Sequence, residues 1–257
     1  MFLSGPPTLS NGAQQASVAG WLVESREVVD STQDLARAKE PWCAVIAMEQ
    51  LRGRGQAGRT FVSNPGGLYL SAVVPFDGGA SRWKGLALAV GWALRETLRR
   101  AGFQRIRLRW PNDLMIGSSK VGGILLEQAS PTTMIVGIGI NLTNRPWLEA
   151  PELKGISGRL VDFKSEVPPR CRFVELILRA IRAAHVLVNR QGFARLVPAI
   201  NRSWGRTRRL ICLDLAVGSE EGTFSGVDAE GCLKLVKLDG TTSRWSHVHV
   251  NRLRELE

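Results

Sequence analysis

Short apolar runs separated by polar or glycine-containing turns dominate the first part of the chain. Such runs, rich in Val, Ile and Leu and bounded by turn residues, are typical of strands. They predict strands at Trp21–Glu27, Pro41–Gln50, Gly67–Val74, Ile106–Trp110, Asp113–Ile116, Val121–Gln128 and Met134–Leu142.

Apolar residues recur at helical spacing in the segments Ser81–Ala101, Cys171–Val188 and Phe193–Trp204. The first of these ends before a glycine, as helices commonly do. A short helix is also predicted after Ser31, to about Ala38, because either Asp30 or Ser31 can serve as its N-cap. The acidic residue three positions after Ser31 completes a pattern like a capping box.

The character of the chain changes near residues 203–208. From Thr207 onward, short β-like runs alternate with glycines at the spacing of a small barrel. We therefore expect a main domain over residues 20–204 and a small β-domain over 205–257. Residues 1–19 are expected to form a flexible tail.

Composition narrows the class of protein. The 257 residues are 44% hydrophobic, which suits a folded globular protein. The sequence has neither a transmembrane run nor a secretory signal at its start, so we expect a cytoplasmic protein with no membrane contact. Since the scattered Cys43, Cys171, Cys212 and Cys232 form no paired motif, we expect no disulfide and no tightly bound structural metal.

The net charge of +11 favours polyanionic partners. Nucleic acid is one such partner, and a basic nucleic-acid-binding module with a small barrel is an alternative that charge leaves open. However, the sequence carries no helix-turn-helix, zinc-finger or RNP-type aromatic motif.

A glycine-rich loop, Leu51–Ser63, contains the pattern G-x-G-x-x-G from Gly53 to Gly58. In a dinucleotide-binding fold this pattern opens a helix. Here a turn and a β-rich run follow it, so the Rossmann interpretation is rejected. The loop also carries arginines that could bind phosphate, which would suit a lid over an anionic nucleotide. A plain surface loop explains it equally well.

Two further segments carry candidate chemistry. Arg109–Asp113 lies between two predicted strands, and Lys120 begins the next strand, whose Gly122 and Gly123 permit close approach of a ligand. A lysine beside a carboxylate substrate can stabilise charge at a phosphorus atom. Asn141 ends a buried strand with a polar amide, as a nucleotide contact would require.

Taken together, four motifs resemble those of the biotin–protein ligases, in the correct order and spacing. They are DSTQDLA (30–36), EQLRGRGQAGRTFVSNPGGLYLS (49–71), RWPNDLMIGSSKVGGILLE (109–127) and GIGINLTN (137–144). The resemblance implies an α+β fold, with a mixed-sheet catalytic domain and packed helices before a small SH3-like barrel. It also implies ATP-dependent activation of biotin to biotinyl-5'-AMP, with pyrophosphate release. Biotin then passes to a lysine on the biotin carboxyl carrier domain of acetyl-CoA carboxylase.

The resemblance assigns roles to individual residues. The catalytic residues that it implies are Lys120, Arg54 and Asp113. It also implies that ATP binds as its complex with Mg²⁺. The biotin contacts are Ser31, Thr32, Gln50, Gly53, Arg54, Gly55, Lys120, Gly122 and Gly123. The ATP contacts are Arg59, Phe61, Asn112, Asp113 and Asn141.

The sequence departs from the family pattern in four places. Gln33 replaces an asparagine, Gln56 replaces a loop arginine, Arg109 replaces a lysine, and Phe61 stands where a tryptophan is usual. These changes bear on rates and adenylate retention more than on the type of reaction.

Three further expectations follow from the resemblance. Only about twenty residues precede the first predicted strand, too few for a three-helix DNA-binding module, so we expect a monofunctional enzyme that binds no DNA. A homodimer is a further option, with Met134–Leu142 as an edge strand that could pair across a two-fold axis. A lipoate–protein ligase, whose fold is related, is the alternative enzyme.

Overall fold

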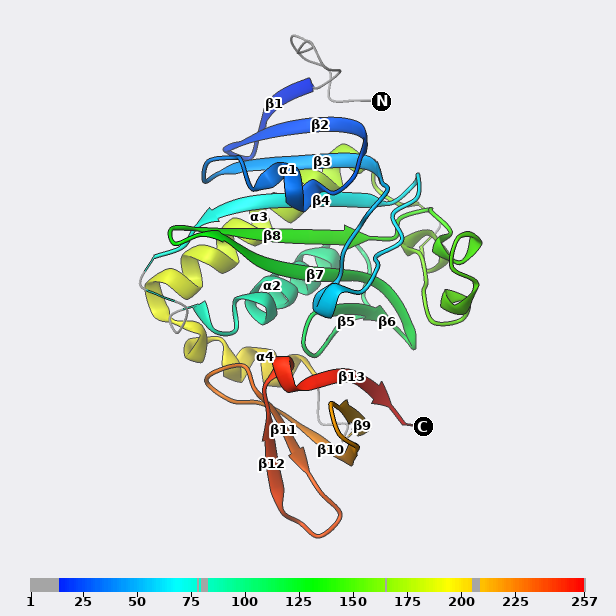
Figure 1. Ribbon diagram of the computed structural model, residues 1–257, viewed down its shortest axis with the longest axis vertical. Helices are drawn as coiled ribbons and strands as arrows, with labels where there is room; N and C mark the ends of the chain where they lie inside the picture. The colour runs from blue at the N-terminus through cyan, green and yellow to red at the C-terminus, as the bar shows by residue number, and fades with distance from the viewer. Residues whose placement is uncertain (1–13, 78, 80–82, 165, 205–208, 257) are drawn as a thin grey trace.

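The computed structural model describes residues 14–77, 79, 83–164, 166–204 and 209–256. A large mixed sheet in the order β1-β2-β3-β4-β8-β7-β6-β5 forms the main body (Figure 1). Neighbouring strands are antiparallel except for the parallel pair β2 and β3. The strands are β1 (Gln14–Val18), β2 (Trp21–Val29), β3 (Cys43–Gln50), β4 (Leu68–Pro75), β5 (Ile106–Arg109), β6 (Asp113–Ile116), β7 (Ser119–Ser130) and β8 (Thr133–Ile140).

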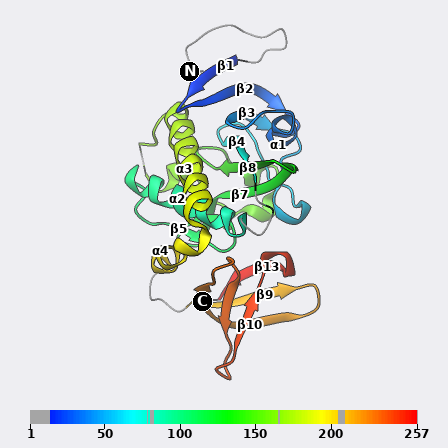
Figure 2. The same cartoon turned by 90° about the vertical axis from the view of Figure 1, so that its left-hand side faces the viewer.

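The two long helices cover one face of this sheet, whereas the short helix α1 (Thr32–Ala36) lies on the other face (Figures 1 and 2). The long helices are α2 (Leu86–Arg100) and α3 (Arg170–Gln191), and α4 (Val197–Ser203) follows. The predicted helix from Ser81 starts later than expected, after Gly85, whose φ of 79° lies outside the helical region. Residues 81 and 82 lie outside the described part of the chain.

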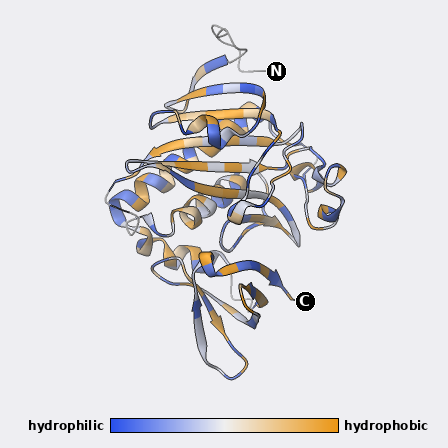
Figure 3. Cartoon of the chain, in the orientation of Figure 1, coloured by the Kyte–Doolittle hydropathy of each residue, from blue (hydrophilic) through white to orange (hydrophobic). Residues whose placement is uncertain are grey.

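Isoleucine and glycine residues alternate along β8, and this alternation makes the two faces of the large sheet different. Ile138 and Ile140 are buried in the core beneath the helices. Gly137 and Gly139 therefore face the opposite side, where a side chain would meet α1 or the glycine-rich loop. In Figure 3 the inner strands are mostly hydrophobic and β1 at the edge is more hydrophilic. One face of the sheet is thus packed against the helices. On the other face, the glycines of β8 carry no side chain and leave space for a ligand.

A second, antiparallel sheet lies beside the β5 edge of the first (Figure 1). Its order is β12-β11-β10-β9-β13. These strands are β9 (Arg209–Leu215), β10 (Ser219–Val227), β11 (Leu233–Val236), β12 (Thr242–Trp245) and β13 (Val250–Glu255). The predicted α+β class, with a small β-domain after a mixed sheet, is confirmed.

The predicted N-terminal tail is wrong for Gln14–Val18. These residues form β1 and pair with β2 in a tight antiparallel ladder, from Gln14 opposite Ser25 to Val18 opposite Trp21. The segment QQASV has little apolar character, so its strand is stabilised by the ladder and was not visible as a pattern. The earlier part of the predicted tail lies outside the described residues.

The predicted dimer edge at Met134–Leu142 is also wrong. This segment is β8, which is hydrogen bonded to β4 on one side and to β7 on the other. A strand paired on both sides has no free edge to offer a second chain. Among the described residues, no helix has both the length and the apolar character needed to cross a membrane.

Candidate active site

A cavity of about 760 Å³ opens on the sheet face opposite the long helices. Its wall combines α1, the glycine-rich loop, the Arg109–Asp113 turn, the start of β7 and strand β13 from the small domain. Of the predicted site residues, those in the wall are Ser31, Thr32, Gln50, Arg54, Gly55, Arg59, Phe61, Asn112, Asp113, Lys120 and Gly123. Segments far apart in sequence therefore meet in one space.

Glycines give this cavity its floor. A Cβ atom on Gly139 would lie 2.5 Å from Cε1 of Phe61, so the ring rests directly on the strand. Across the sheet, Gly139 pairs with Gly123 of β7, where an added Cβ would lie 3.6 Å from Nζ of Lys120. The floor thus runs from below Phe61 to the Lys120 amine with no side chain rising from these two glycines.

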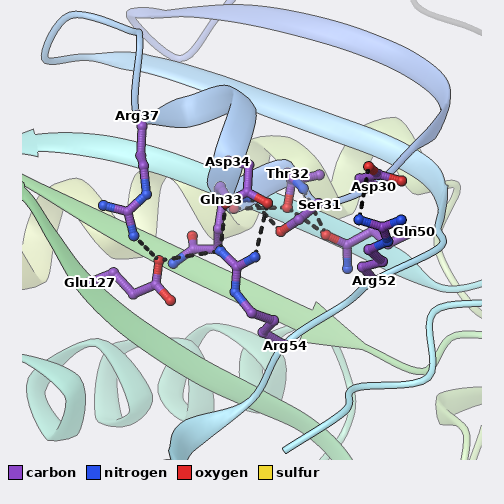
Figure 4. Close-up of polar contacts among 11 residues, drawn as sticks. Asp30, Ser31, Thr32, Gln33, Asp34, Arg37, Gln50, Arg52, Arg54 and Glu127 are labelled. Atoms are coloured by element: carbon purple, nitrogen blue, oxygen red, sulfur yellow. Dashed lines mark hydrogen bonds and ion pairs between the residues drawn. The ribbon is translucent and has the colours of Figure 1, made fainter. Parts of the chain in front are cut away.

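The start of helix α1 and the end of strand β3 place polar residues together at one end of the cavity. Oγ of Ser31 accepts a hydrogen bond from N–H of Gln33 at 3.2 Å, so the N-cap is Ser31 and not Asp30. Oε1 of Gln50 accepts hydrogen bonds from N–H and Oγ1 of Thr32, at 2.8 and 2.9 Å. Figure 4 shows these side chains clustered beneath α1. The cluster fixes the first motif against β3 and β4.

The predicted capping box is only half formed. The carboxylate of Asp34 receives two hydrogen bonds from Arg54 of the loop, at 2.9 and 2.7 Å, instead of turning back to the helix start (Figure 4). Arg54 also lies 3.6 Å from Glu127 of β7, which is hydrogen bonded to Arg37 at 2.8 Å. The hydrogen bonds from Arg54 hold the pKa of the Asp34 carboxyl below its usual value. Arg54 therefore ties the loop to both α1 and β7.

The loop has a defined backbone. N–H of Gly55 donates to the carbonyl of Arg59 at 2.7 Å, and N–H of Phe61 donates to the carbonyl of Gly53 at 2.9 Å. A Cβ on Gly53 would lie 2.3 Å from the carbonyl oxygen of Phe61, so this glycine is required for the close return of the chain. Gly53 is not part of the cavity wall, and in this structure it allows the close contact between the two ends of the loop.

At the other end of the cavity, Asp113 is held between two cations. Its carboxylate lies 2.5 Å from Nζ of Lys120 and 2.6 Å from Nη2 of Arg109. Burial raises the pKa of Asp113, but attraction to Lys120 and Arg109 outweighs burial and brings the pKa below its usual value. Asp113 is therefore ionised, and a carboxylate held in this way is a weak base.

Two predicted ligand contacts face the protein instead. Both ends of the Asn141 amide are hydrogen bonded, to the carbonyl of Gly158 at 3.2 Å and to Asn144 at 3.0 Å. Asn141 and Gly122 are not part of the cavity wall. A Cβ on Gly122 would lie 2.7 Å from the carbonyl oxygen of Gly139, so that glycine serves the contact between β7 and β8.

Comparisons with known proteins agree with this geometry. Residues 21–141 match the model of the biotin/lipoate A/B protein ligase family. The chain is 30% identical to the bifunctional ligase/repressor BirA of Escherichia coli K12, over 95% of this chain and 78% of that protein. It is 31% identical to the biotin–[acetyl-CoA-carboxylase] ligase of Paracoccus denitrificans, over 74% of this chain and 82% of that one.

A solved structure extends the likeness to the whole fold. The biotin protein ligase of Aquifex aeolicus, solved with biotin and ATP, has a TM-score of 0.79 and 26% identity. The match covers 91% of this chain and 99% of that one. The chain belongs to the biotin–protein ligase family. The family predicted from the four motifs is thus confirmed.

For a biotin–protein ligase, three of the departures from the family pattern have a clear place in this structure. Arg109, which replaces a lysine, spans the turn to reach Asp113 with two nitrogens, at 2.6 and 3.3 Å. Phe61, which replaces a tryptophan, keeps an aromatic ring on the cavity floor. Gln56 lines the cavity within the loop.

Several residues that complete the site were not predicted as part of it. Asp34 and Glu127 lie inside the motifs, but Asp34 was assigned only a capping role and Glu127 none, because their partner Arg54 is distant in sequence. Strand β13 contributes Val250 to Glu255 to the cavity wall, a contact between domains that no local pattern reveals. No cluster of three or more His, Cys, Asp or Glu that could bind a metal occurs among the described residues.

Proposed function

We propose that this chain activates biotin with Mg-ATP and transfers it to a lysine of the biotin carboxyl carrier domain of acetyl-CoA carboxylase. The observation that carries the proposal is one cavity that joins the arginine-bearing loop to the Lys120–Asp113–Arg109 cluster. Its volume of about 760 Å³ lies in the range of small-molecule sites. Both substrates can therefore meet in one place.

In the first step, a carboxylate oxygen of biotin attacks the α-phosphorus of ATP. A C–O–P bond forms, the bond from the α-phosphorus to the bridging oxygen breaks, and pyrophosphate leaves. Lys120 and Arg109 supply positive charge at one end of the cavity, and Arg59 supplies it from the loop. Fixed charge of this kind stabilises the developing negative charge on the phosphorus oxygens.

In the second step, the acceptor amine attacks the carbonyl carbon of biotinyl-5'-AMP. An amide C–N bond forms, the bond from the carbonyl carbon to the phosphate oxygen breaks, AMP leaves, and the proton of the amine passes to water. The low pKa of Asp113 makes it a poor acceptor for the proton that this amine loses. We assign it instead to holding Lys120 and to receiving the Mg²⁺ that accompanies ATP. The loop shields the mixed anhydride from water, because Arg54 fastens it to α1 and β7.

The test is transfer of labelled biotin to a carrier domain with and without ATP, together with ATP–pyrophosphate exchange. Exchange that requires biotin supports the proposal. Exchange with lipoate and not with biotin would instead identify a lipoate–protein ligase. Tight, salt-dependent binding of DNA or RNA without any exchange would favour the nucleic-acid-binding module.

Three narrower predictions accompany the proposal. We propose that the enzyme acts in the cytoplasm, that it binds no DNA, and that it can form a homodimer. A two-fold contact would have to use a surface other than β8, which is internal to the sheet. Sedimentation of the purified protein at several concentrations tests the dimer, and a gel-shift assay with duplex DNA tests the second point.

A further inference from the structure

Lys120 lies at an irregular point of strand β7, which pairs with β6 on one side and with β8 on the other (Figure 1). Leu114 of β6 pairs with Gly122. The next residue of β6, Met115, pairs with Lys120 instead of Val121. Val121 is therefore an extra residue on β7, and the strand forms a β-bulge there. Bulges of this kind change the direction in which neighbouring side chains point.

The bulge places the side chain of Lys120 on the cavity side of the sheet. A Cβ on Gly91 would lie 3.2 Å from Cδ1 of Ile124, so Ile124 of β7 points toward helix α2. Side chains of a regular strand alternate, so Lys120 would then point toward the core and Val121 toward the cavity. In the structure Val121 is buried in the core and Lys120 lines the cavity. The extra residue thus reverses the directions of these two side chains.

Asn141, the residue that follows β8, is hydrogen bonded on both sides of the bulge. Its main-chain N–H donates to the carbonyl of Val121 at 2.8 Å, and its side-chain Nδ2 donates to the carbonyl of Gly158 at 3.2 Å. N–H of Gly158 donates to the carbonyl of Lys120 at 2.9 Å, and N–H of Lys120 donates to the carbonyl of Ile156 at 2.8 Å. Asn141 therefore fastens the segment that holds the main chain of Lys120.

The amide of Asn141 is itself held in one orientation. It is buried, and its Oδ1 accepts a hydrogen bond from Nδ2 of Asn144 at 3.0 Å. Nδ2 of Asn144 also donates to Oδ1 of Asn64 at 3.2 Å. Because a donor occupies Oδ1 of Asn141, its Nδ2 is the end that faces Gly158. Both ends of this amide are thus used within the protein.

We propose that Asn141 is a positioning residue for Lys120, because it holds the bulge that directs the amine of Lys120 at the α-phosphorus of ATP. Asn141 fixes the main chain of Lys120 through Gly158. The side chain is then fixed by Asp113, whose carboxylate lies 2.5 Å from Nζ. This inference rests on the proposed function, and it replaces the nucleotide contact that the family resemblance implies for Asn141.

The first test is the kinetics of Asn141→Ala, measured with the full chain as biotin-dependent ATP–pyrophosphate exchange. A displaced Lys120 weakens mainly the transition state, so kcat should fall about tenfold or more while the KM for ATP changes by less than about twofold. In a Lys120→Ala background the amine is already gone, and Asn141→Ala should lower the rate by less than about twofold. A raised KM with unchanged kcat would identify a direct nucleotide contact and overturn the inference. Additive losses in the double variant would also overturn it.

Asn201→Ala is the matched control. Nδ2 of Asn201 donates to the carbonyl of Val227 at 3.0 Å, and Oδ1 accepts from N–H of the same residue at 2.9 Å. The control therefore also removes a partly buried amide with two hydrogen bonds, but outside the wall of the active-site cavity. Its exchange rate should match that of the natural protein. A loss as large as that of Asn141→Ala would show a general structural effect and overturn the inference.

The second test follows the position of the amine without any substrate. Trace labelling with acetic anhydride, read by mass spectrometry, gives the reaction rate of each lysine. Lys120 is paired with Asp113, and Lys39 is paired in a similar way with Glu24 at 2.6 Å. Asn141→Ala should make Lys120 react several-fold faster, because its amine leaves Asp113 more often, and should leave the rate of Lys39 unchanged. An unchanged rate at Lys120 would overturn the inference.

If Asn141→Ala does not fold, Asn141→Ser is measured in the same way. Failure of both variants to fold would show that the amide serves the fold alone and would overturn the inference. If the natural protein shows no biotin-dependent exchange, the proposed function itself fails. That result is separate, because the labelling of Lys120 depends on no substrate.

Discussion

Arg54 and Asp34 form a two-bonded ion pair that fastens the glycine-rich loop to helix α1. Nη1 of Arg54 lies 2.9 Å from Oδ2 of Asp34, and Nη2 lies 2.7 Å from Oδ1. The family resemblance gives Arg54 to the biotinyl adenylate, but in the free protein its guanidinium is bound to a carboxylate. Arg54 therefore holds the loop against α1 when no substrate is bound.

Replacing Asp34 with asparagine should loosen this loop. The pair is partly exposed, so the free energy of unfolding should change by about 1 kcal/mol or less. The local effect should be larger, because Arg54 would keep only its longer contact with Glu127. We expect trypsin to cleave the loop of the free Asp34→Asn variant several-fold faster, as measured by mass spectrometry of timed digests.

The control for this experiment is Asp162→Asn. Asp162 pairs with Arg159 at 2.5 Å, and neither residue is part of the cavity wall. Its loop cleavage should match that of the natural protein. Equal cleavage rates for Asp34→Asn and the natural protein would reject the view that the ion pair holds the loop.

Lys120→Ala should abolish most of the adenylation activity. The amine is the cation nearest to Asp113, and losing one such donor costs about 3 kcal/mol in transition-state stabilisation, roughly a hundredfold in rate. Arg109 remains beside Asp113, so the variant should still fold. ATP–pyrophosphate exchange in the presence of biotin measures the loss.

Lys39→Ala is the matched control. Lys39 also pairs with a carboxylate, that of Glu24 at 2.6 Å, but it lies outside the cavity wall. Its exchange rate should be unchanged. A Lys120→Ala enzyme that releases pyrophosphate at the normal rate would remove Lys120 from the chemistry.

Local patterns predicted the elements well and their arrangement poorly. Alternation and turn residues gave every strand of the large sheet except β1, which consists of Gln14–Val18 and has almost no apolar signal. Strand order depends on which ladders form, and β8 was taken for an edge although it lies between β4 and β7. Hydrogen-bond partners across a sheet leave no trace in the periodicity of a single strand.

The residues of the candidate site were likewise predicted well, and the contacts between them poorly. Motifs placed Lys120 and Asp113 in one site, and the structure brings them to 2.5 Å. Motifs could not show that Arg54 reaches back to Asp34, because that contact depends on how the loop folds over α1. Nor could they show that Asn141 turns toward Gly158 and away from the cavity.

The buried His185 should make the protein less stable in mild acid. The residue is 3% exposed, and its ring stacks on Trp83 with centroids 4.8 Å apart and makes a T-shaped contact with Trp42, with centroids 5.3 Å apart. Nε2 is hydrogen bonded to the carbonyl of Pro75 at 2.8 Å, and Nδ1 is buried without a partner. Burial, with a smaller effect of Arg182, lowers the pKa of His185 below 6.5, although the Pro75 carbonyl and Asp77 oppose this.

The direction of this change in stability follows from the linkage between proton binding and folding. A histidine with a lowered pKa in the folded state takes up its proton in the unfolded state first, so stability falls as the pH drops below about 6.5. We expect the Tm to fall by about 2–4 °C for each kcal/mol lost between pH 7.5 and 5.5. His185→Phe should show a smaller change over this range, and exposed His249→Asn should behave like the natural protein. An equal pH dependence in His185→Phe would contradict the prediction.

Gly139 and Phe61 should be energetically coupled, because the ring rests on the glycine. A Cβ on Gly139 would lie 2.5 Å from Cε1 of Phe61, so Gly139→Ala must displace the ring or the strand. Overpacking of this kind costs about 1–3 kcal/mol, and a displaced ring should raise the KM for ATP if Phe61 contacts adenine as the family resemblance implies. In a Phe61→Ala background the space is free, and the same glycine change should cost well under 1 kcal/mol. Urea unfolding of the natural protein, both single variants and the double variant measures the coupling; additive costs would show that the ring is not what the glycine accommodates.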